Sequence, residues 1–232
     1  MKIALLHPQC ETQGGAIKMA LLSADLLQKA GHDVVLYTFS YSPNCFTLLQ
    51  KNTHIVHHNL AKKIIFSSVK KLINIMTLAW RIRHVDIVIA NNPPMQIVAA
   101  LAKFFSLSSI TTIWWHHHTP WYKSGYFLKS FLERTFILPF IDTIVATSYF
   151  VKKQISEYCG REATVIHPIL DKNFSSPSSF QKKFKEEQDN GENFLLFTHG
   201  RLEPGKGLET IISIFERIKK DDKNIHLTLY GT

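Results

Sequence analysis

The sequence predicts a doubly wound α/β protein in which crossover helices join parallel strands. Short apolar or β-branched runs alternate with helical stretches along the chain of 232 residues, and this alternation is typical of a parallel sheet. Hydrophobic residues make up 45 % of the chain and charged residues 19 %, which is the composition of a globular core. Together these observations assign the chain to the α/β class.

The elements follow from local patterns taken in order. The short apolar run inside residues 2–7 predicts a buried first strand there, and a helix is expected at 15–30, ended by Gly31. Further strands are predicted where apolar and β-branched residues cluster, at 32–38, 54–57, 85–90, 109–115, 142–147, 162–167, 193–198 and 224–230. Further helices are predicted from helical periodicity, at 61–82, 94–105, 121–138, 148–158 and 206–220. The apolar window 97–115 is interrupted by Lys103 and diluted by Ser and Thr, so it predicts helix, turn and strand rather than a membrane span.

Composition divides the chain into three parts. Residues 171–192 are rich in Ser, Lys, Asn and Glu and hold few large apolar side chains, which predicts a linker. Residues 1–170 hold enough strands for an independent N-terminal Rossmann-like domain. Residues 193–232 hold only two predicted strands and one helix, which leaves much apolar surface uncovered. We expect them to be the incomplete start of a second domain, either in a truncated chain or in one that a partner completes.

Charge and cysteine content narrow the functional classes. The formal net charge of +9, from 27 basic and 18 acidic residues, favours anionic partners such as nucleotide phosphates or anionic lipid. No nucleic-acid-binding motif accompanies the charge, so nucleic acid is not expected as a partner. The cysteines Cys10, Cys45 and Cys159 are widely spaced, which indicates neither a disulfide framework nor a zinc site. The first apolar run is too short for a signal peptide, and we expect a cytoplasmic protein.

Residues 61–82 mix Lys and Arg with bulky apolar side chains at helical spacing. Two readings are open, and both can hold at once. In one, the helix lies on an anionic membrane, which makes the protein peripheral on the inner face of the membrane. In the other, its apolar stripe packs on the sheet.

The most informative stretch is a glycine-rich turn between a strand and a helix. It reads His199-Gly200-Arg201-Leu202-Glu203-Pro204-Gly205-Lys206-Gly207. Helix-start N–H groups, permissive glycines and the cations of Arg201 and Lys206 favour an anion such as a diphosphate. The turn nearly matches the phosphate loop of nucleotide triphosphatases, but Gly207 lacks the hydroxyl that binds magnesium. We therefore expect a nucleotide-linked substrate, with a solvated turn of incidental charges as the alternative.

Two further strand ends carry candidate site residues. Gly14 and Gly15 precede a helix, where they let a ligand approach the helix dipole or simply permit a turn. His116, His117 and His118 follow a strand at the carboxyl edge of the sheet, and alternation puts His116 and His118 on one side and His117 on the other. Because no nearby carboxylate or cysteine completes a ligand set, we expect no metal. A histidine that bonds a sugar is the favoured interpretation, and edge packing beside the tryptophans is the alternative.

These segments together resemble the retaining family-4 glycosyltransferases, which have the GT-B architecture of two Rossmann-like domains. The first strand with its glycine pair resembles the family's opening, and residues 26–35 resemble its L-x-x-x-G-H-x-V stretch. Residues 144–152 resemble its V-x-x-S-x-x-x-K segment, and residues 164–171 resemble its V-I-x-P-G-V-D segment, although Ile169 replaces the usual glycine. The most specific match is Gly200-Arg201-Leu202-x-x-x-Lys206-Gly207.

The resemblance implies transfer of a sugar from a nucleotide-diphosphate donor to a glycan or lipid-linked acceptor, with retention, in cell-envelope glycan assembly. It implies that Arg201 and Lys206 hold the donor diphosphate and offset charge on the leaving group. His118 would contact the transferred sugar, with His116 as the alternative register. Gly14 and Gly15 would admit the phosphate. Neither a metal nor another cofactor is implied.

One part of the family pattern is missing. The E-x7-E motif, which binds the donor sugar and the ribose in this family, would lie beyond Thr232. The resemblance therefore implies a hexosyltransferase that is inactive as this chain. The alternative is a non-catalytic or split-enzyme subunit that binds a partner supplying the missing donor domain.

Overall fold

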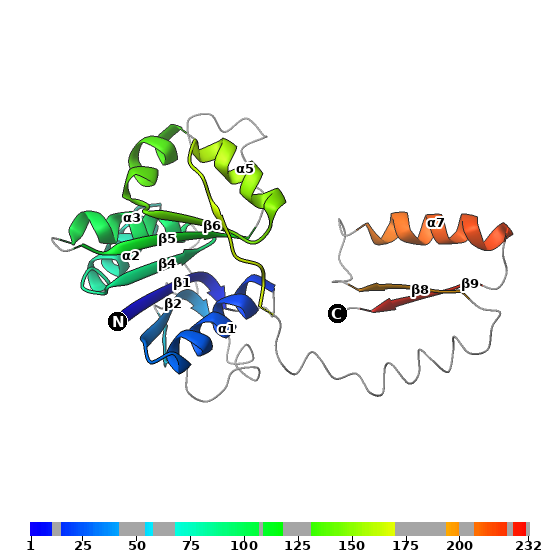
Figure 1. The fold of residues 1–232 in the computed structure, drawn as a ribbon, viewed down its shortest axis with the longest axis horizontal. Coiled ribbons are helices and arrows are strands. Elements are labelled where there is room, and N and C mark those ends of the chain that lie inside the picture. Colours follow the sequence, from blue (N-terminus) through cyan, green and yellow to red (C-terminus); the bar gives the residue numbers. More distant parts are fainter. Residues whose placement is uncertain are drawn as a thin grey trace. The chain divides into compact units, whose positions relative to one another are not determined.

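The computed structural model describes residues 1–10, 15–41, 54–57, 68–106, 109–117, 131–169, 194–199, 207–221 and 225–230. The chain forms two compact units, Met1–Leu170 and Asp171–Thr232, each of which can be followed in Figure 1. The linker predicted at 171–192 lies outside the described residues, as do residues 61–67 and 121–130 of two predicted helices.

The first unit is built on a seven-stranded parallel sheet with strand order β3-β2-β1-β4-β5-β6-β7. The strands are β1 (Lys2–Cys10), β2 (Asp33–Tyr41), β3 (His54–His57), β4 (Ile87–Asn91), β5 (Thr111–His116), β6 (Thr143–Ala146) and β7 (Thr164–Val165). The chain builds outward from β1 to β3 and then returns to the other side of β1 for β4. This reversal confirms the doubly wound α/β prediction.

Helices cover both faces of this sheet (Figure 1). The helix α1 (Gly15–Lys29) packs on one face, and the other is covered by α2 (Ser68–Arg81), α3 (Met95–Phe105) and α5 (Tyr149–Cys159). The helices α1 and α5 each end next to a glycine with a left-handed backbone. Gly31 has φ of 84° and Gly160 has φ of 64°, and glycine adopts this conformation without strain. Within the described ranges, no helix combines the length and apolar character needed to cross a bilayer.

The helix predicted at 121–138 does not end as expected. Its described C-terminal part is a π-helical turn, η3 (Glu133–Ile137), followed by a 3₁₀ turn, η4 (Leu138–Phe140). Pro139 explains the change, because proline lacks an N–H and its ring clashes with the carbonyl of the preceding turn. The periodicity of the apolar residues does not report this backbone effect.

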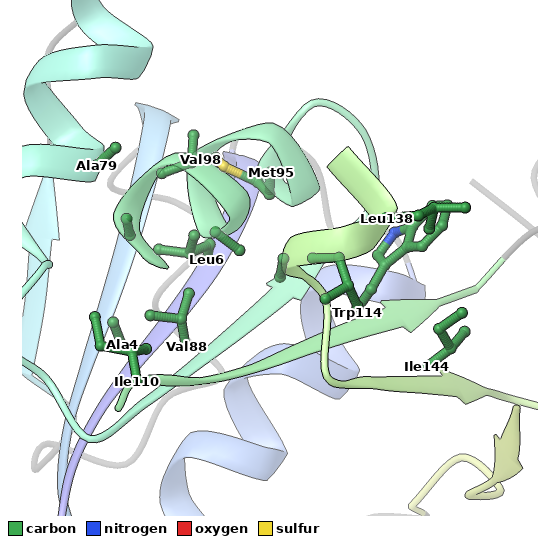
Figure 2. Packing of buried hydrophobic residues seen from close by; sticks show 14 of the residues in the cluster. Ala4, Leu6, Ala79, Val88, Met95, Val98, Ile110, Trp114, Leu138 and Ile144 are labelled. Atoms are coloured by element: carbon green, nitrogen blue, oxygen red, sulfur yellow. The ribbon is translucent and has the colours of Figure 1, made fainter. Parts of the chain in front are cut away.

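Successive side chains of the strands enter two separate cores. Ala4 and Leu6 of β1 face α2, α3 and α5, whereas Ile3 and Leu5 face α1. Figure 2 shows Ala4 and Leu6 beneath the α3 helix. The same alternation sends Trp114 of β5 to the first face and Trp115 to the second. The core residues therefore show which face of the sheet any residue of β4 or β5 lies on.

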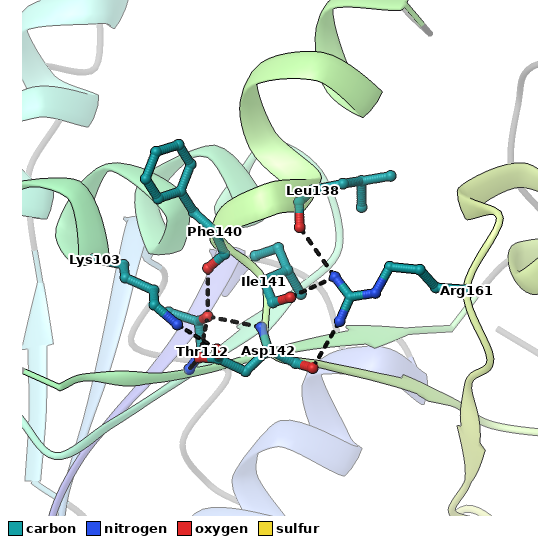
Figure 3. A network of polar contacts seen from close by, with 7 residues as sticks. All are labelled: Lys103, Thr112, Leu138, Phe140, Ile141, Asp142 and Arg161. Atoms are coloured by element: carbon teal, nitrogen blue, oxygen red, sulfur yellow. Dashed lines mark hydrogen bonds and ion pairs between the residues drawn. The ribbon is translucent and has the colours of Figure 1, made fainter.

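A polar network ties the amino ends of β5 and β6 together (Figure 3). Asp142 accepts a hydrogen bond from the Thr112 backbone N–H at 2.8 Å and pairs with the ammonium of Lys103. The Thr112 hydroxyl donates to the carbonyl of Phe140 at 2.5 Å. Arg161 donates to three backbone carbonyls at 2.6 to 3.1 Å, those of Leu138, Ile141 and Asp142. The network fixes the chain as it leaves η4 and enters β6.

The second unit contains the parallel pair β8 (Phe194–His199) and β9 (Ile225–Tyr230), joined through α7 (Leu208–Asp221). Among its residues whose burial the structure describes, Ile225 is buried. Ile212, Ile214 and Ile218 of α7 are instead 39 to 51 % exposed. The described part of this unit therefore presents an apolar helix surface to solvent.

Candidate functional site

The reversal of strand order marks the candidate site in the first unit. In open α/β sheets, ligands bind at the carboxyl ends of the strands, where the order reverses. Here that point lies between the ends of β1 and β4, which are neighbours in the sheet. The helix α1 begins shortly after β1, so its N-terminus lies at the same edge.

Gly15 is the first residue of α1 and is exposed. A Cβ placed on it would meet no atom within 4 Å, and its φ is not in the positive range that Gly31, Gly160 and Gly207 adopt. Neither a strained turn nor a clash within the described protein therefore requires glycine at this position. Approach of a ligand to Gly15 and a turn at Gly14 both stay open as interpretations of the glycine pair, because Gly14 lies outside the described residues.

The N-terminus of α1 has the electrostatics of an anion site. The first N–H groups of a helix lack intrahelical partners and carry a partial positive charge. The first turn of α1 contains no acidic residue that would compete with a bound anion. A phosphate at this position would be held by the backbone, with space above Gly15 to approach it.

The histidines at the end of β5 separate onto opposite faces, as strand alternation predicted for His116 and His117. The His116 ring lies beside Trp114 with centroids 4.9 Å apart, and His116 is only 5 % exposed. The His117 ring stacks on Trp115 at 5.4 Å and 21°. His116 is thus packed in the way that the edge-packing alternative predicted, and His117 lies on the α1 face.

A contact that the sequence did not reveal joins His117 to β4. Its Nε2 lies 2.9 Å from Oδ1 of Asn91, and with the amide oxygen facing the ring, Nε2 carries the hydrogen. Asn91 has no exposed surface, and its Nδ2 has no hydrogen-bond partner among the described residues. An unsatisfied buried donor is unusual and costs stability, so Asn91 is a feature of the site that packing alone does not explain.

His7 belongs to the same cluster. It follows Leu6, which pairs with Ala90, the residue before Asn91, and strand alternation places it on the α1 face. Its Nδ1 lies 2.8 Å from the carbonyl of Gln9. His7, Asn91 and His117 therefore lie towards the carboxyl ends of three adjacent strands, β1, β4 and β5, on the face that α1 covers. Counting alternate residues back from each strand end is the sequence signal that could have found them.

The other predicted site residues, Gly14, His118, Arg201 and Lys206, lie outside the described residues. Gly207 alone represents the glycine-rich turn, with φ of 75° and a carbonyl that accepts from the Ile211 N–H at 3.0 Å. Serine or threonine would be strained at this φ, which gives a backbone reason for the absent hydroxyl. Among the described residues there is no group of three His, Cys, Asp or Glu that could hold a metal ion.

The sequence comparison decides the family. Residues 13–174, well over half of the chain, match the family described as Glycosyltransferase Family 4. The chain belongs to glycosyltransferase family 4. The matched range contains the start of α1, Asn91 and all three histidines at the end of β5, whereas the turn at 199–207 lies outside it.

Relatives of this family-4 chain are distant. The alpha-1,3/1,6-mannosyltransferase ALG2 of Candida glabrata is 27 % identical over 194 residues, covering 74 % of this chain and 41 % of ALG2. The structure of HepE from Anabaena in complex with UDP and glucose matches with a TM-score of 0.67 and 19 % identity, over 99 % of this chain and 60 % of HepE. A glycosyltransferase from Rickettsia africae matches with a TM-score of 0.63 and 16 % identity, over 100 % of this chain and 68 % of that one.

Two conclusions follow from these matches. The fold agrees with GT-B glycosyltransferases, as predicted. The family-4 chain spans less than half the length of ALG2 and about three fifths of HepE.

Proposed function

We propose that this chain is the acceptor-side domain and the opening of the donor domain of a glycosyltransferase. It would transfer a sugar from a nucleotide-diphosphate sugar to a glycan or lipid-linked acceptor, with retention of configuration. Membership of glycosyltransferase family 4 over residues 13–174 carries this proposal. Support comes from relatives, since ALG2 is named a mannosyltransferase and HepE was solved with UDP and glucose.

The donor diphosphate is assigned to backbone N–H groups and two cations. Gly15 leaves space for a phosphate at the N-terminus of α1, and Gly14, which precedes it in the sequence, is assigned the same role. Arg201 and Lys206 would pair with the diphosphate and offset the charge that grows on the nucleotide as the glycosidic bond breaks. Two fixed cations supply the role that a divalent metal otherwise fills, so the proposed reaction uses none.

The sugar is assigned to the end of β5. His118 would contact the transferred sugar, with His116 as the alternative, although His116 is buried against Trp114. Asn91 holds His117 through its amide oxygen and so fixes the start of the segment that carries His118. This contact gives Asn91 a positioning role in the proposal.

Binding of a nucleotide diphosphate tests the assignment of the cations. The chain would be titrated with UDP and with inorganic pyrophosphate, while NMR follows the backbone amides. Because charge-assisted hydrogen bonds to a phosphate contribute about 1.5–3 kcal/mol each, Arg201→Ala or Lys206→Ala should weaken binding about tenfold or more. Lys219→Ala, which removes a charge from the last turn of α7, is the matched control. Equal binding by all variants, or no shift at Gly14 and Gly15, would contradict the assignment.

We further propose that the chain has no turnover alone. The exposed isoleucines of α7 support this, because a helix with an uncovered apolar stripe calls for further packing elements. The assay combines the chain with labelled nucleotide sugars and lipid-linked acceptors. Product formation without any added protein would overturn this part of the proposal.

The same exposed surface favours a second candidate, a split-enzyme subunit whose partner supplies the rest of the donor domain. Isolation from the native cell separates the two. A subunit would copurify with a partner and gain turnover with it, whereas a remnant of a longer enzyme would be recovered alone or aggregated.

A further inference from the structure

The helix α2 carries apolar side chains on two different faces. The face that enters the core is fully buried and consists of Leu78, Ala79 and Ile82. A second set is 43 to 55 % exposed and consists of Leu72, Ile73, Met76 and Trp80. At 3.6 residues per turn the two sets lie about 120° apart around the helix axis. Packing on the sheet, one reading of this segment, therefore explains only one of the two faces.

The exposed face continues onto α3, which packs beside α2 (Figure 1). Phe104 in the last turn of α3 is 63 % exposed. The Trp80 ring meets Phe105 at 5.8 Å, and Phe105 meets Phe104 at 5.6 Å. We name this surface the α2–α3 ridge, and its members are Leu72, Ile73, Met76, Trp80 and Phe104. It is a row of aromatic and aliphatic groups across two helices.

In the sequence, the segment that contains α2 carries charge of one sign. Between Asp33 and Asp86 the chain has no acidic residue, and it has seven basic ones: Lys51, Lys62, Lys63, Lys70, Lys71, Arg81 and Arg83. The guanidinium of Arg83 lies 3.6 Å from the centroid of the Trp80 ring and donates to the Trp80 carbonyl at 2.6 Å. A cation thus lies directly against the tryptophan ring of the ridge.

We infer that the α2–α3 ridge seats this protein on the surface of an anionic lipid bilayer. Tryptophan prefers the membrane–water boundary, because its ring is apolar and its N–H is polar. Amphipathic helices with basic residues bind this boundary by combining apolar burial with attraction to anionic headgroups. A second copy of the chain is a poorer occupant, since two copies of a segment that has seven basic and no acidic residues would repel each other. The inference needs only lipid headgroups and does not depend on the proposed reaction.

Flotation with vesicles tests the inference on the full chain. Vesicles of phosphatidylglycerol and phosphatidylcholine in equal parts should carry the chain upward, and vesicles of phosphatidylcholine alone should carry much less. Raising the salt concentration should weaken binding, because it screens the headgroup charge. Burial of one aromatic ring changes partition about tenfold, so the double variant Trp80→Ala, Phe104→Ala should bind about a hundredfold less.

The matched control removes two aromatic rings from another exposed place. Tyr149 and Phe150 at the start of α5 are 73 % and 64 % exposed, and replacing both with alanine should leave vesicle binding unchanged. Circular dichroism verifies that each variant is folded. Equal loss in the control pair, or unchanged binding by the ridge variant, would overturn the inference.

Fluorescence locates the contact independently. Subtracting the emission spectrum of Trp80→Phe from that of the parent chain gives the emission of Trp80. This emission should shift to shorter wavelength when anionic vesicles are added. Trp80→Phe should still bind, because phenylalanine keeps an apolar ring at this position. Vesicle binding without this shift would assign lipid to another surface. A dimer seen by light scattering and lost in the ridge variant would assign the ridge to a second copy instead.

Discussion

Asp142 provides the sharpest test of how the first unit is held together. Its carboxylate accepts a hydrogen bond from the Thr112 N–H at 2.8 Å. The pairing of β5 with β6 begins one residue later, at Ile113 and Thr143, so no backbone carbonyl of β6 accepts from this N–H. The N–H is buried, because Thr112 has no exposed surface. Asp142→Ala should therefore destabilise the first unit by the loss of a hydrogen bond to a charged acceptor, about 1.5–3 kcal/mol. The ion pair with Lys103 adds little, about 0–1 kcal/mol, because the Asp142 side chain is 40 % exposed.

A set of variants separates these contributions. Asp142→Ala should cost about 1.5–3 kcal/mol, and Asp142→Asn about 1 kcal/mol because a neutral oxygen still accepts from Thr112. Lys103→Met should cost less than about 1 kcal/mol, because it removes only the exposed pair. Urea unfolding followed by tryptophan emission measures these values for the first unit, since every tryptophan of the chain precedes residue 171. If Asp142→Ala unfolds at the same urea concentration as the parent chain, the buried N–H does not depend on the carboxylate.

The pH dependence of Asp142 has a definite sign. Burial raises the pKa of this carboxyl, but hydrogen bonds from Lys103 and Thr112 outweigh burial and hold the pKa below the ordinary value for aspartate. A lowered pKa in the folded state adds stability that is fully present above pH 4, roughly the unfolded value, and is lost as pH falls through the folded value. The gap between the parent chain and Asp142→Asn should therefore shrink at pH 3. A gap that stays constant down to pH 2 would contradict this assignment.

Three further predictions concern the first unit. Burial, with the charge of Glu133, raises the pKa of the Cys159 thiol to about 12. Iodoacetamide at pH 8 should therefore label Cys159 at least about a hundredfold more slowly in the folded chain than in urea. Similar labelling rates, measured by peptide mass spectrometry, would contradict this. Gly160→Ala should destabilise by about 1 kcal/mol because φ at Gly160 is 64°. Gly15→Ala, with nothing within 4 Å and no positive φ, should instead raise the urea midpoint slightly, by about 0.4–1 kcal/mol of stability. Equal midpoints for both variants would refute the backbone argument. Tyr158→Phe removes the 2.7 Å hydrogen bond from the Tyr158 hydroxyl to Glu133 and should cost about 1–3 kcal/mol in the same titration, a result that an unshifted midpoint would exclude.

Most elements of the first unit were predictable because their signals are local. The strand at 54–57 has the predicted bounds, and α1 ends before Gly31 as expected. The strand β1 was predicted to end at residue 7 but continues to Cys10. The extension includes Pro8, and proline donates no hydrogen bond to a neighbouring strand. Beyond Leu6, however, β1 pairs only with β2, and its edge towards β4 makes no strand pairs. Because no hydrogen bond is needed on that edge, the N–H that Pro8 lacks costs no stability there.

The candidate site also contains residues that the sequence could predict and contacts that it could not. Glycines, cations and histidines at strand ends were visible in the sequence. At the carboxyl edge of a parallel sheet each strand is followed by a loop, so residues that come directly after a predicted strand lie at that edge. The contact between His117 and Asn91 was not, since the two residues are 26 positions apart and meet only because β4 and β5 are neighbours. The exposed face of α2 was likewise hidden, because helical spacing shows that apolar residues are present but not which of them the sheet covers.

The sequence by itself determined the class of fold, the order of its elements and the residue types at its strand ends, because periodicity and backbone preference act over a few neighbouring residues. Tertiary structure alone decided which strand lies beside which, which histidine faces α1, and which apolar residues of α2 remain in contact with water. Those outcomes depend on packing between segments that are distant along the chain, and local patterns carry no information about such distances.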